Sequence, residues 1–352
     1  SNPLSERIVL SSWAATKPAD RHSECQTMMA AGVILIGLIL LLLGAEVMIR
    51  GAVALARRFS ISPHVIGLTV IAFGTSAPEL FVSLKAALQG APGIAIGNVI
   101  GSNIANILLM IGTVGVITPF VCRGAPLKRD GSVLLIGTLV FVGVGLNGVI
   151  ERWHGIVMLV LLVSYLVYCY FDERRSKGDD SIHAKEVEEF DQVPENVWKA
   201  LGFTLGGLAA VLVGARFLVD GAIEVAEYAG VSQTVIGVTV VAVGTSLPEL
   251  ATTVIAAMRK HSDVALGNII GSNIFNTLGI LGTVSIVTPL EIPPEVMSLD
   301  LWFMVGVTIL FVGLALRLPA FSRPWAVIFF LAYATFITNQ FYPLQNLAIA
   351  TS

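Results

Sequence analysis

The sequence predicts an all-α polytopic membrane protein, with ten transmembrane helices arranged as two inverted-topology repeats of five and with broken helices at the core. Three observations predict this fold class. The 352-residue chain is 55% hydrophobic and only 13% charged, with a mean hydropathy of +0.83, whereas soluble domains are about 25% charged. Its apolar runs are long enough to span a bilayer. Its two halves also repeat each other.

Each predicted span is an apolar run close to the length of about 20 residues that a bilayer requires. The spans are expected at residues 28–56, 64–89, 94–117, 131–147, 150–171, 197–227, 234–258, 264–288, 299–316 and 323–341. The first repeat is therefore 28–171 and the second is 197–342. Residues 1–27 form a polar N-terminal tail or an expression remnant, 172–196 form an acidic linker, and 343–352 form a C-terminal tail.

An internal duplication relates the two halves. Laid over each other without a gap, residues 42–119 and 212–289 agree at 36 of 78 positions. Gly-Thr-Ser-Ala-Pro-Glu-Leu at 74–80 returns as Gly-Thr-Ser-Leu-Pro-Glu-Leu at 244–250, and the Gly-Asn-x-x-Gly-Ser-Asn-Ile-x-Asn stretch at 97–106 returns at 267–276. Because five spans is an odd number, the second half must enter the membrane upside down. Inverted repeats with a site at their interface are typical of secondary transporters.

The distribution of Lys and Arg predicts the orientation, because these residues concentrate in cytoplasmic loops. With the start of the chain outside, the inside loops hold 14 of them and the outside segments hold five. We therefore expect a multi-pass protein of the cell (inner or plasma) membrane with both termini outside. The linker has nine acidic and four basic residues. It lacks the glycine-containing loop of a calcium site, so a solvated cytoplasmic linker is favoured over a regulatory one.

The repeated Gly-Thr-Ser-x-Pro-Glu motif places a carboxylate inside an apolar span, where a charge costs roughly 2.5 to 3.5 kcal/mol on insertion scales. Pro78 has no N–H and its ring clashes with the carbonyl of Gly74, so we expect the helix to break there. The carbonyls freed near Ala72 and Gly74 become oxygen ligands. Irregular backbone at this depth is tolerated only where it is buried in protein or lines a cavity.

The second repeated motif adds neutral oxygens. Ser102 and Asn106 are four residues apart and share a helix face, as do Ser272 and Asn276. Together with Thr75, Ser76 and Glu79, and with Thr245, Ser246 and Glu249, they make an all-oxygen set without Cys or His. This set suits hard cations such as Ca²⁺ or Na⁺ and does not suit zinc or copper. Two roles are open for Asn98, Asn103, Asn268 and Asn273, namely helix bridging or capping and ligation, and both roles are also open for Thr69 and Thr239.

The two carboxylates also predict the electrical behaviour of an exchange. Ionised Glu79 and Glu249 neutralise one Ca²⁺ or two Na⁺, and they leave a third Na⁺ uncompensated. A three-for-one exchange through this site would be electrogenic and sensitive to voltage.

Charged pairs lie in the first and sixth spans. Glu46 and Arg50 are four residues apart, as are Arg216 and Asp220, with the signs exchanged at equivalent positions. Each pair can close an ion pair one turn along a helix. Structural self-neutralisation is favoured over a role on the ion path.

With these motifs the chain resembles the sodium/calcium exchangers of the cation/calcium antiporter superfamily, in particular the compact prokaryotic calcium/sodium antiporters. The resemblance covers residues from about Met28 to Tyr342. It implies alternating access, in which the first and sixth spans slide over a rigid core. It also implies that the matching positions line four central cation sites. The implied ligands are Thr75, Ser76, Glu79, Ser102, Asn106, Thr245, Ser246, Glu249, Ser272 and Asn276, joined by the carbonyls of Ala72 and Ala242.

One departure bears on the transported ions. Some prokaryotic members and the potassium-dependent branch have Asp where this chain has Asn276, which argues against potassium co-transport. The resemblance thus implies Na⁺/Ca²⁺ exchange, with Na⁺ and Ca²⁺ as transported ions and no cofactor. The runner-up is an H⁺/Ca²⁺ antiporter that uses the same two glutamates, although the proton-coupled members usually carry Gly-Asn in place of Gly-Thr-Ser.

Other functional classes fit less well. A passive channel usually has symmetry about the pore axis, which inverted repeats lack. An intramembrane hydrolase would need a nucleophile elbow or a metalloprotease motif, and Ser76 has no closing glycine after it. We therefore do not expect an enzyme. The net charge of −3 gives no reason to expect nucleic acid, and the bilayer is the one partner that the sequence indicates, with no obligatory protein partner evident.

Overall fold

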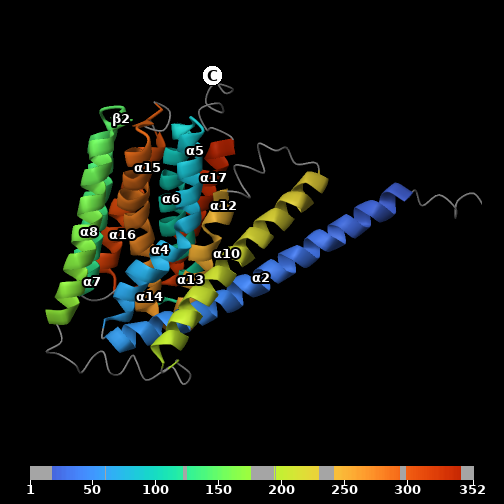
Figure 1. Cartoon of the computed structure of the whole chain (residues 1–352), viewed down its shortest axis with the longest axis horizontal. Helices are drawn as coiled ribbons and strands as arrows, with labels where there is room; N and C mark the ends of the chain where they lie inside the picture. The colour runs from blue at the N-terminus through green and yellow to red at the C-terminus, as the bar shows by residue number, and fades with distance from the viewer. Residues whose placement is uncertain are drawn as a thin grey trace, which may run out of the picture.

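The computed structural model describes residues 18–59, 61–121, 125–175, 194, 196–229, 242–293 and 299–341. Within these ranges the chain is built of helices and four two-residue strands (Figure 1). In chain order the elements are α2 (Pro18–Phe59), α3 (Pro63–Ile66), η1 (Gly67–Ile71), α4 (Ala72–Thr75), α5 (Ala77–Leu88), α6 (Pro92–Ile117), β1 (Phe120–Val121), α7 (Ala125–Gly145), β2 (Val149–Ile150), α8 (Arg152–Arg175), α10 (Val197–Tyr228), α12 (Ala242–Thr245), α13 (Leu247–Met258), α14 (Ser262–Ile274), η4 (Phe275–Ile280), α15 (Leu281–Val287), β3 (Leu290–Glu291), α16 (Leu301–Arg317), β4 (Ala320–Phe321) and α17 (Arg323–Phe341).

Helices lie at every predicted span, except that residues 234–241 of the seventh span fall outside the described part of the chain. Among the described residues, five helices are long and apolar enough to cross a membrane, and a bent pair, Pro63–Thr75 with Ala77–Leu88, would make a sixth. The five are Met28–Phe59, Pro92–Ile117, Arg152–Asp172, Val197–Tyr228 and Ser262–Val287.

Two helices extend beyond their predicted bounds. α2 begins at Pro18, inside the predicted N-terminal tail, and α8 continues to Arg175, inside the predicted linker. Most of the linker, residues 176–193 and 195, lies outside the described residues, as do the tail residues 1–17 and 343–352.

The two long helices α2 and α10 pack against each other and run diagonally across the front of the bundle in Figure 1. Glycines at intervals of seven residues line their contact. A Cβ on Gly44 would lie 2.8 Å from the backbone nitrogen of Val211, and a Cβ on Gly214 would lie 2.5 Å from that of Leu41. The backbones therefore approach as closely as small residues permit. The glycines are Gly37, Gly44 and Gly51 on α2 and Gly207, Gly214 and Gly221 on α10.

The helical segment that carries the first repeated motif bends at the motif. α3, η1 and α4 lead into Ser76, whose φ of −83° and ψ of 8° depart from helical values, and α5 continues beyond it at a bend of 43°. Pro78 occupies the first turn of α5, where its missing N–H would have had no intrahelical acceptor. The bend thus lies at Ser76, between Thr75 and the carboxylate of Glu79.

Short strand pairs join the two halves at both ends of the bundle. β1, which follows α6, pairs with β4, whereas β3, which follows α15, pairs with β2. Because α7 lies between β1 and β2, the two strand pairs sit at opposite ends of that helix. α6 therefore ends where the equivalent segment α14–η4–α15 begins, and the two run in opposite directions.

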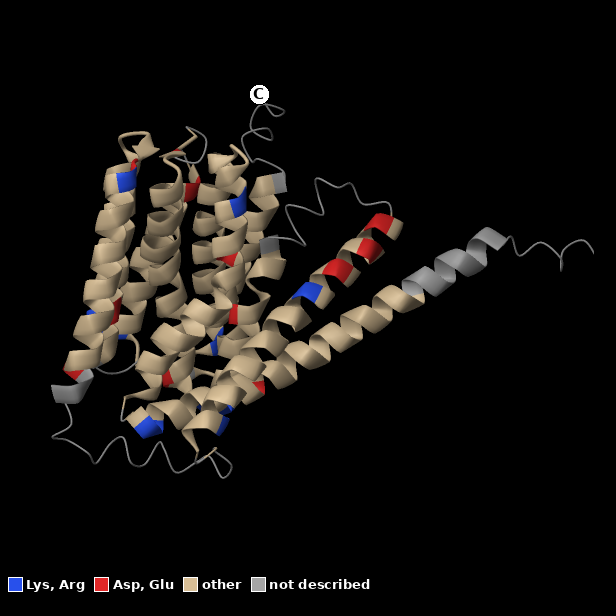
Figure 2. Cartoon of the chain, in the orientation of Figure 1, with Lys and Arg blue, Asp and Glu red and all other residues tan. Residues whose placement is uncertain are grey.

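Apolar residues fill the bundle and also cover much of its outside. α6 and α14 form the centre of the core, with buried residues such as Ile100, Ile104 and Ile270. Large apolar side chains such as Leu35 and Val160 are exposed. Most of the helical surface in Figure 2 carries neither Lys or Arg nor Asp or Glu, which suits contact with lipid.

Candidate cation site

The two copies of the Gly-Thr-Ser-x-Pro-Glu motif have the same local structure. Ser76 precedes α5, and Ser246 precedes α13 with a nearly identical φ of −88° and ψ of 2°. In each copy the proline and the glutamate lie in the first turn of the following helix. A carboxylate there is favoured by the positive end of the helix dipole. The sequence thus places Glu79 and Glu249 at two equivalent helix starts.

The first contact of the site joins the two halves of the chain. Ser76 Oγ donates a hydrogen bond to Glu249 Oε1 at 2.8 Å. Both glutamates are 1% exposed, and they lie close enough for their negative charges to repel each other. Two carboxylates held together out of water are stabilised by a cation between them or by protonation of one of them.

Several buried polar atoms of the predicted ligand set have no hydrogen-bond partner. One oxygen of each glutamate is in this state, and so is the hydroxyl of Ser272. Asn106 and Asn276 have neither an acceptor for the amide nitrogen nor a donor to the amide oxygen, although they are 1% and 0% exposed. Buried polar groups without partners are rare in proteins, and one reason for them is a place where an ion or a water molecule binds.

The donor set fits a hard cation. Within the described ranges no group of three or more His, Cys, Asp or Glu side chains is placed to hold a metal ion. Two carboxylates are therefore the charged donors, and hydroxyl, amide or carbonyl oxygens must supply the rest of a coordination shell. This composition is the one that Ca²⁺ and Na⁺ accept and that zinc does not.

The remaining predicted ligands are buried or partly buried around the same helices. Thr75 is fully buried and its hydroxyl donates to Ile71 O at 3.0 Å, while Ser102 is buried on α6. Thr245 is partly buried in α12. Asn276 lies in the π-helical segment η4, whereas its counterpart Asn106 lies in the regular helix α6. π-helical turns frequently occur at functional sites.

The backbone at the break differs from expectation in one respect. The Ala72 carbonyl accepts a hydrogen bond from Ser76 N at 3.0 Å and another from Thr75 Oγ1 at 3.3 Å. The turn at Ser76 keeps this carbonyl bonded within the chain, so the proline does not free it in this conformation. The backbone of Ala242 starts α12.

Two of the four asparagines with an open role bond within the core. Asn103 Nδ2 donates to Thr277 Oγ1 at 2.9 Å, and Asn273 Nδ2 donates to Ile269 O at 2.7 Å. Both are helix-to-helix or intrahelical contacts. Thr69 likewise donates to Val65 O at 2.6 Å, while Thr239 lies outside the described residues.

The intramembrane charged pairs neutralise themselves as expected. Glu46 Oε1 lies 2.7 Å from Arg50 Nη2, and Arg216 Nε lies 3.6 Å from Asp220 Oδ2. Sequence reasoning missed a third partner, because Glu46 Oε2 also lies 2.8 Å from Arg259 at the end of α13. Both carboxylate oxygens of Glu46 are thus occupied by arginines, which supports the structural role.

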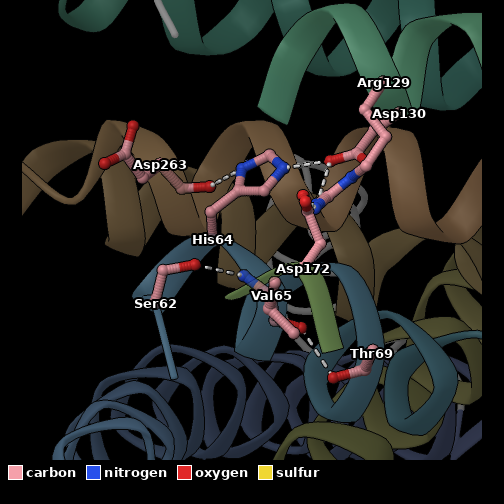
Figure 3. A network of polar contacts seen from close by, with 8 residues as sticks. All are labelled: Ser62, His64, Val65, Thr69, Arg129, Asp130, Asp172 and Asp263. Atoms are coloured by element: carbon pink, nitrogen blue, oxygen red, sulfur yellow. Dashed lines mark hydrogen bonds and ion pairs between the residues drawn. The ribbon is translucent and has the colours of Figure 1, made fainter. Parts of the chain in front are cut away.

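A second buried polar network was not anticipated at all (Figure 3). His64 Nε2 lies 2.6 Å from Asp130 Oδ2, and His64 Nδ1 lies 3.1 Å from the backbone carbonyl of Asp263. Arg129 bonds Asp130 and also Asp172, at 2.6 and 2.7 Å. Both ring nitrogens of His64 thus face an oxygen atom. Contacts across 66 and 199 residues leave no periodic signal in a sequence.

This network lies at the start of α7, just before the fourth predicted span, and connects α3, α7, α8 and α14. Burial of Asp130 opposes its ionisation. The hydrogen bonds from His64 and Arg129 outweigh this effect and hold the pKa of Asp130 below its usual value. The network is therefore a fixed ionic junction of four helices.

Comparisons with known proteins agree on one family. The sequence profile of the sodium/calcium exchanger protein family matches residues 29–171 and 199–342. The chain is 32% identical to the sodium/calcium exchanger MaX1 of Methanosarcina acetivorans, over 88% of this chain and 98% of that one. It is 36% identical to the inner membrane protein YrbG of Escherichia coli, over 82% and 90%. A solved structure of the sodium-calcium exchanger NCX_Mj superposes with a TM-score of 0.77 at 33% identity, covering 89% of this chain and 99% of that chain. The chain, a multi-pass membrane antiporter, therefore belongs to the sodium/calcium exchanger family.

Proposed function

We propose that the protein is a secondary active transporter that exchanges Na⁺ for Ca²⁺ across the membrane by alternating access. One observation carries this proposal. Two glutamates at equivalent helix starts are buried, Ser76 of one repeat donates a hydrogen bond to Glu249 of the other, and buried oxygens of the same motifs lack partners. A hard cation would satisfy both the charges and the free oxygens.

We further propose that exchange is electrogenic and independent of K⁺. Glu79 and Glu249 offer two negative charges, which match one Ca²⁺ but not three Na⁺. Asn276 supplies an amide and no charge, whereas the potassium-dependent branch has Asp at this position, and this difference supports independence of K⁺. The proposed binding residues are Ala72, Thr75, Ser76, Glu79, Ser102 and Asn106, with Ala242, Thr245, Ser246, Glu249, Ser272 and Asn276 at the equivalent positions.

The proposed membrane architecture has ten spans in two inverted repeats, 28–171 and 197–342, with the acidic linker 172–196 in the cytoplasm and both termini outside. Support comes from the opposite directions of α6 and α14–η4–α15 and from the excess of Lys and Arg in alternate loops. Fusion of alkaline phosphatase or of green fluorescent protein to the C-terminus tests the orientation. Active phosphatase with a dark fluorescent protein is expected, and the opposite pattern would reverse the topology.

Uptake by vesicles tests the function itself. Purified protein is reconstituted into vesicles loaded with Na⁺ and diluted into Na⁺-free choline buffer that contains radioactive Ca²⁺. Uptake that requires internal Na⁺, proceeds without K⁺ and disappears in Glu249→Gln is expected. A parallel sample carries a pH gradient and no Na⁺. Uptake in that sample alone would instead identify an H⁺/Ca²⁺ antiporter that uses the same glutamates.

The proposal that exchange is electrogenic is tested separately, by imposing a membrane potential on the vesicles. If three Na⁺ leave for each Ca²⁺ that enters, one positive charge leaves the vesicle in each cycle. An inside-positive potential should then accelerate uptake and an inside-negative potential should slow it, at about 2.3 kcal/mol per charge per 100 mV. A rate of Ca²⁺ uptake that does not change with the imposed potential would show electroneutral exchange.

A further inference from the structure

Asn98 on α6 is bonded to the helical turn that carries Glu79. Its Nδ2 donates to the backbone carbonyl of Glu79 at 3.2 Å and to Ser83 Oγ at 2.9 Å. Ser83 lies one turn after Glu79 on α5. The amide therefore spans the first turn of α5 and ties this turn to α6.

Asn268 on α14 makes the same contacts in the second half. Its Nδ2 lies 3.3 Å from the backbone carbonyl of Glu249 and 2.8 Å from Thr253 Oγ1. At the offset of 170 residues, Asn98, Glu79 and Ser83 correspond to Asn268, Glu249 and Thr253. Because the same three-residue contact occurs in both halves, we regard it as a feature of the repeated motif and not of one half alone.

The chemistry of the amide determines its orientation in these contacts. A backbone carbonyl only accepts hydrogen bonds, so it can be faced by the amide nitrogen but not by the amide oxygen. The nitrogen of each asparagine is therefore used to bridge two helices, whereas the buried amide oxygen of Asn268, like those of Asn106 and Asn276, has no hydrogen-bond partner.

Each bridging asparagine lies on the same helix face as two of the proposed ion ligands. Asn98, Ser102 and Asn106 follow one another at intervals of four residues and so share a face of α6, and the same holds for Asn268, Ser272 and Asn276 on α14 and η4. One helix thus carries the neutral ligands, its neighbour carries the glutamate, and the asparagine joins the two.

We propose that Asn98 and Asn268 are positioning residues, each of which fixes the glutamate of its half at the correct distance from the serine and asparagine ligands. The inference rests on the proposed function, because these ligands are proposed to bind the transported cations. A calcium shell needs oxygens at roughly 2.3 to 2.6 Å. A turn that is no longer held against its neighbouring helix presents its carboxylate over a wider range of positions and so binds the ion less tightly.

The test compares binding and transport in Asn268→Ala and Asn98→Ala with the wild type, using the full chain. Binding is followed by the Ca²⁺ concentration at the midpoint of thermal stabilisation in detergent, and transport by the KM and the maximal rate of Na⁺-driven Ca²⁺ uptake. We expect the midpoint and the KM to rise about fivefold or more, as the loss of a hydrogen bond of ordinary strength implies. The maximal rate per folded protein should change less than the KM.

The matched control is Asn273→Ala, since Asn273 is equally buried on α14 and its amide oxygen also lacks a partner, but its Nδ2 donates to Ile269 O within its own helix. It should lower the melting temperature without moving the Ca²⁺ midpoint. The double variant Asn268→Ala with Thr253→Val adds a readout that a general loss of packing would not give, because its effect on the midpoint should be smaller than the sum of the single effects.

The outcomes separate this inference from the proposed function. Wild-type protein that is stabilised by Ca²⁺ but shows no Na⁺-driven uptake would refute exchange, while the midpoints would still decide the role of the asparagines. Should Asn268→Ala fail to fold, the partly exposed Asn98 supplies the decisive variant. Midpoints equal to that of the wild type, or shifts no larger than the one in Asn273→Ala, would overturn the proposal.

Discussion

Ser76 and Glu249 are 173 residues apart in the chain, and the hydroxyl of the first donates a 2.8 Å hydrogen bond to the carboxylate of the second. Ser76 ends the helix of one motif, and Glu249 starts the helix of the other. The contact therefore makes the candidate site a property of both halves together. Substitutions in either motif should affect the binding of one common set of ions.

Removal of either carboxylate should abolish transport. Glu249→Gln takes away one of the two charges that replace the hydration shell of the ion, so Ca²⁺ uptake should fall to the background of empty vesicles. Insertion and size-exclusion behaviour should be retained, because the amide has nearly the same shape. Glu291→Gln is the matched control, since Glu291 is exposed on β3. Normal uptake by Glu79→Gln or Glu249→Gln would refute the assignment of the site.

Asn276→Asp should change ion selectivity more than it changes stability. Both amide atoms of Asn276 lack partners in a fully buried position, so a carboxylate there adds a third charge to the site. We expect a different preference among Na⁺, K⁺ and Ca²⁺ and a new dependence of uptake on pH. Uptake measured with each cation and from pH 6 to 9 checks this. Profiles that match the wild type would mean that Asn276 does not bind the ions.

Asp130→Asn should destabilise the protein near neutral pH. Breaking a buried ion pair by removing one partner costs about 3 to 5 kcal/mol, because Arg129 and His64 would be left facing a neutral amide. Asp263→Asn is the matched control, since His64 contacts the backbone of Asp263 and not its carboxylate. Thermal unfolding in detergent should show a lower melting temperature for Asp130→Asn alone.

The pH dependence of that difference follows from the lowered pKa of Asp130. A carboxyl group whose folded pKa lies below its unfolded value of about 3.9 stabilises the fold above that value, and the contribution is lost as the pH falls through the folded pKa. The gap in melting temperature between the wild type and Asp130→Asn should therefore be full at pH 7 and shrink below about pH 4. A gap that stays constant over this range would contradict the ionic role.

Gly44→Ala should separate the long helices. A Cβ at this position would lie 2.8 Å from Val211 N and 2.9 Å from Ala210 Cβ, and overpacking of this kind costs about 1 to 3 kcal/mol. Lower melting temperature and slower uptake are expected. Gly313→Ala, on an exposed part of α16, should match the wild type in both measurements. Equal stability of the two variants would show that α2 and α10 do not need this close approach.

Much of the fold could be predicted because it is local or repeated. Apolar runs gave the places of the helices, and the duplication identified Glu79 and Glu249 without knowledge of any contact. The ion pair between Glu46 and Arg50 followed from their spacing of four residues. Each of these inferences rests on residues that are close in sequence or related by a constant offset.

The other features could not be predicted, because they depend on contacts or local geometry that neither short sequence spacing nor the repeat reveals. Arg259 reaches Glu46 across 213 residues, and Asp130 reaches His64 across 66. The π-helical turn at Asn276 has no counterpart at Asn106, although the asparagines are equivalent in the alignment. The Ala72 carbonyl stayed bonded because the turn at Ser76 supplies a donor, which a rule about proline alone does not anticipate.

The strand pairs have a consequence for how the two halves of the chain are held together. Each pair takes one strand from each half, β1 with β4 and β2 with β3, and the two pairings are exchanged by the internal repeat. A protein of half this length could form the same contacts only by associating with a second, oppositely inserted copy of itself, in which each subunit gives a strand to the other. The single chain therefore has the geometry of an antiparallel homodimer, and the covalent link makes this pairing independent of protein concentration.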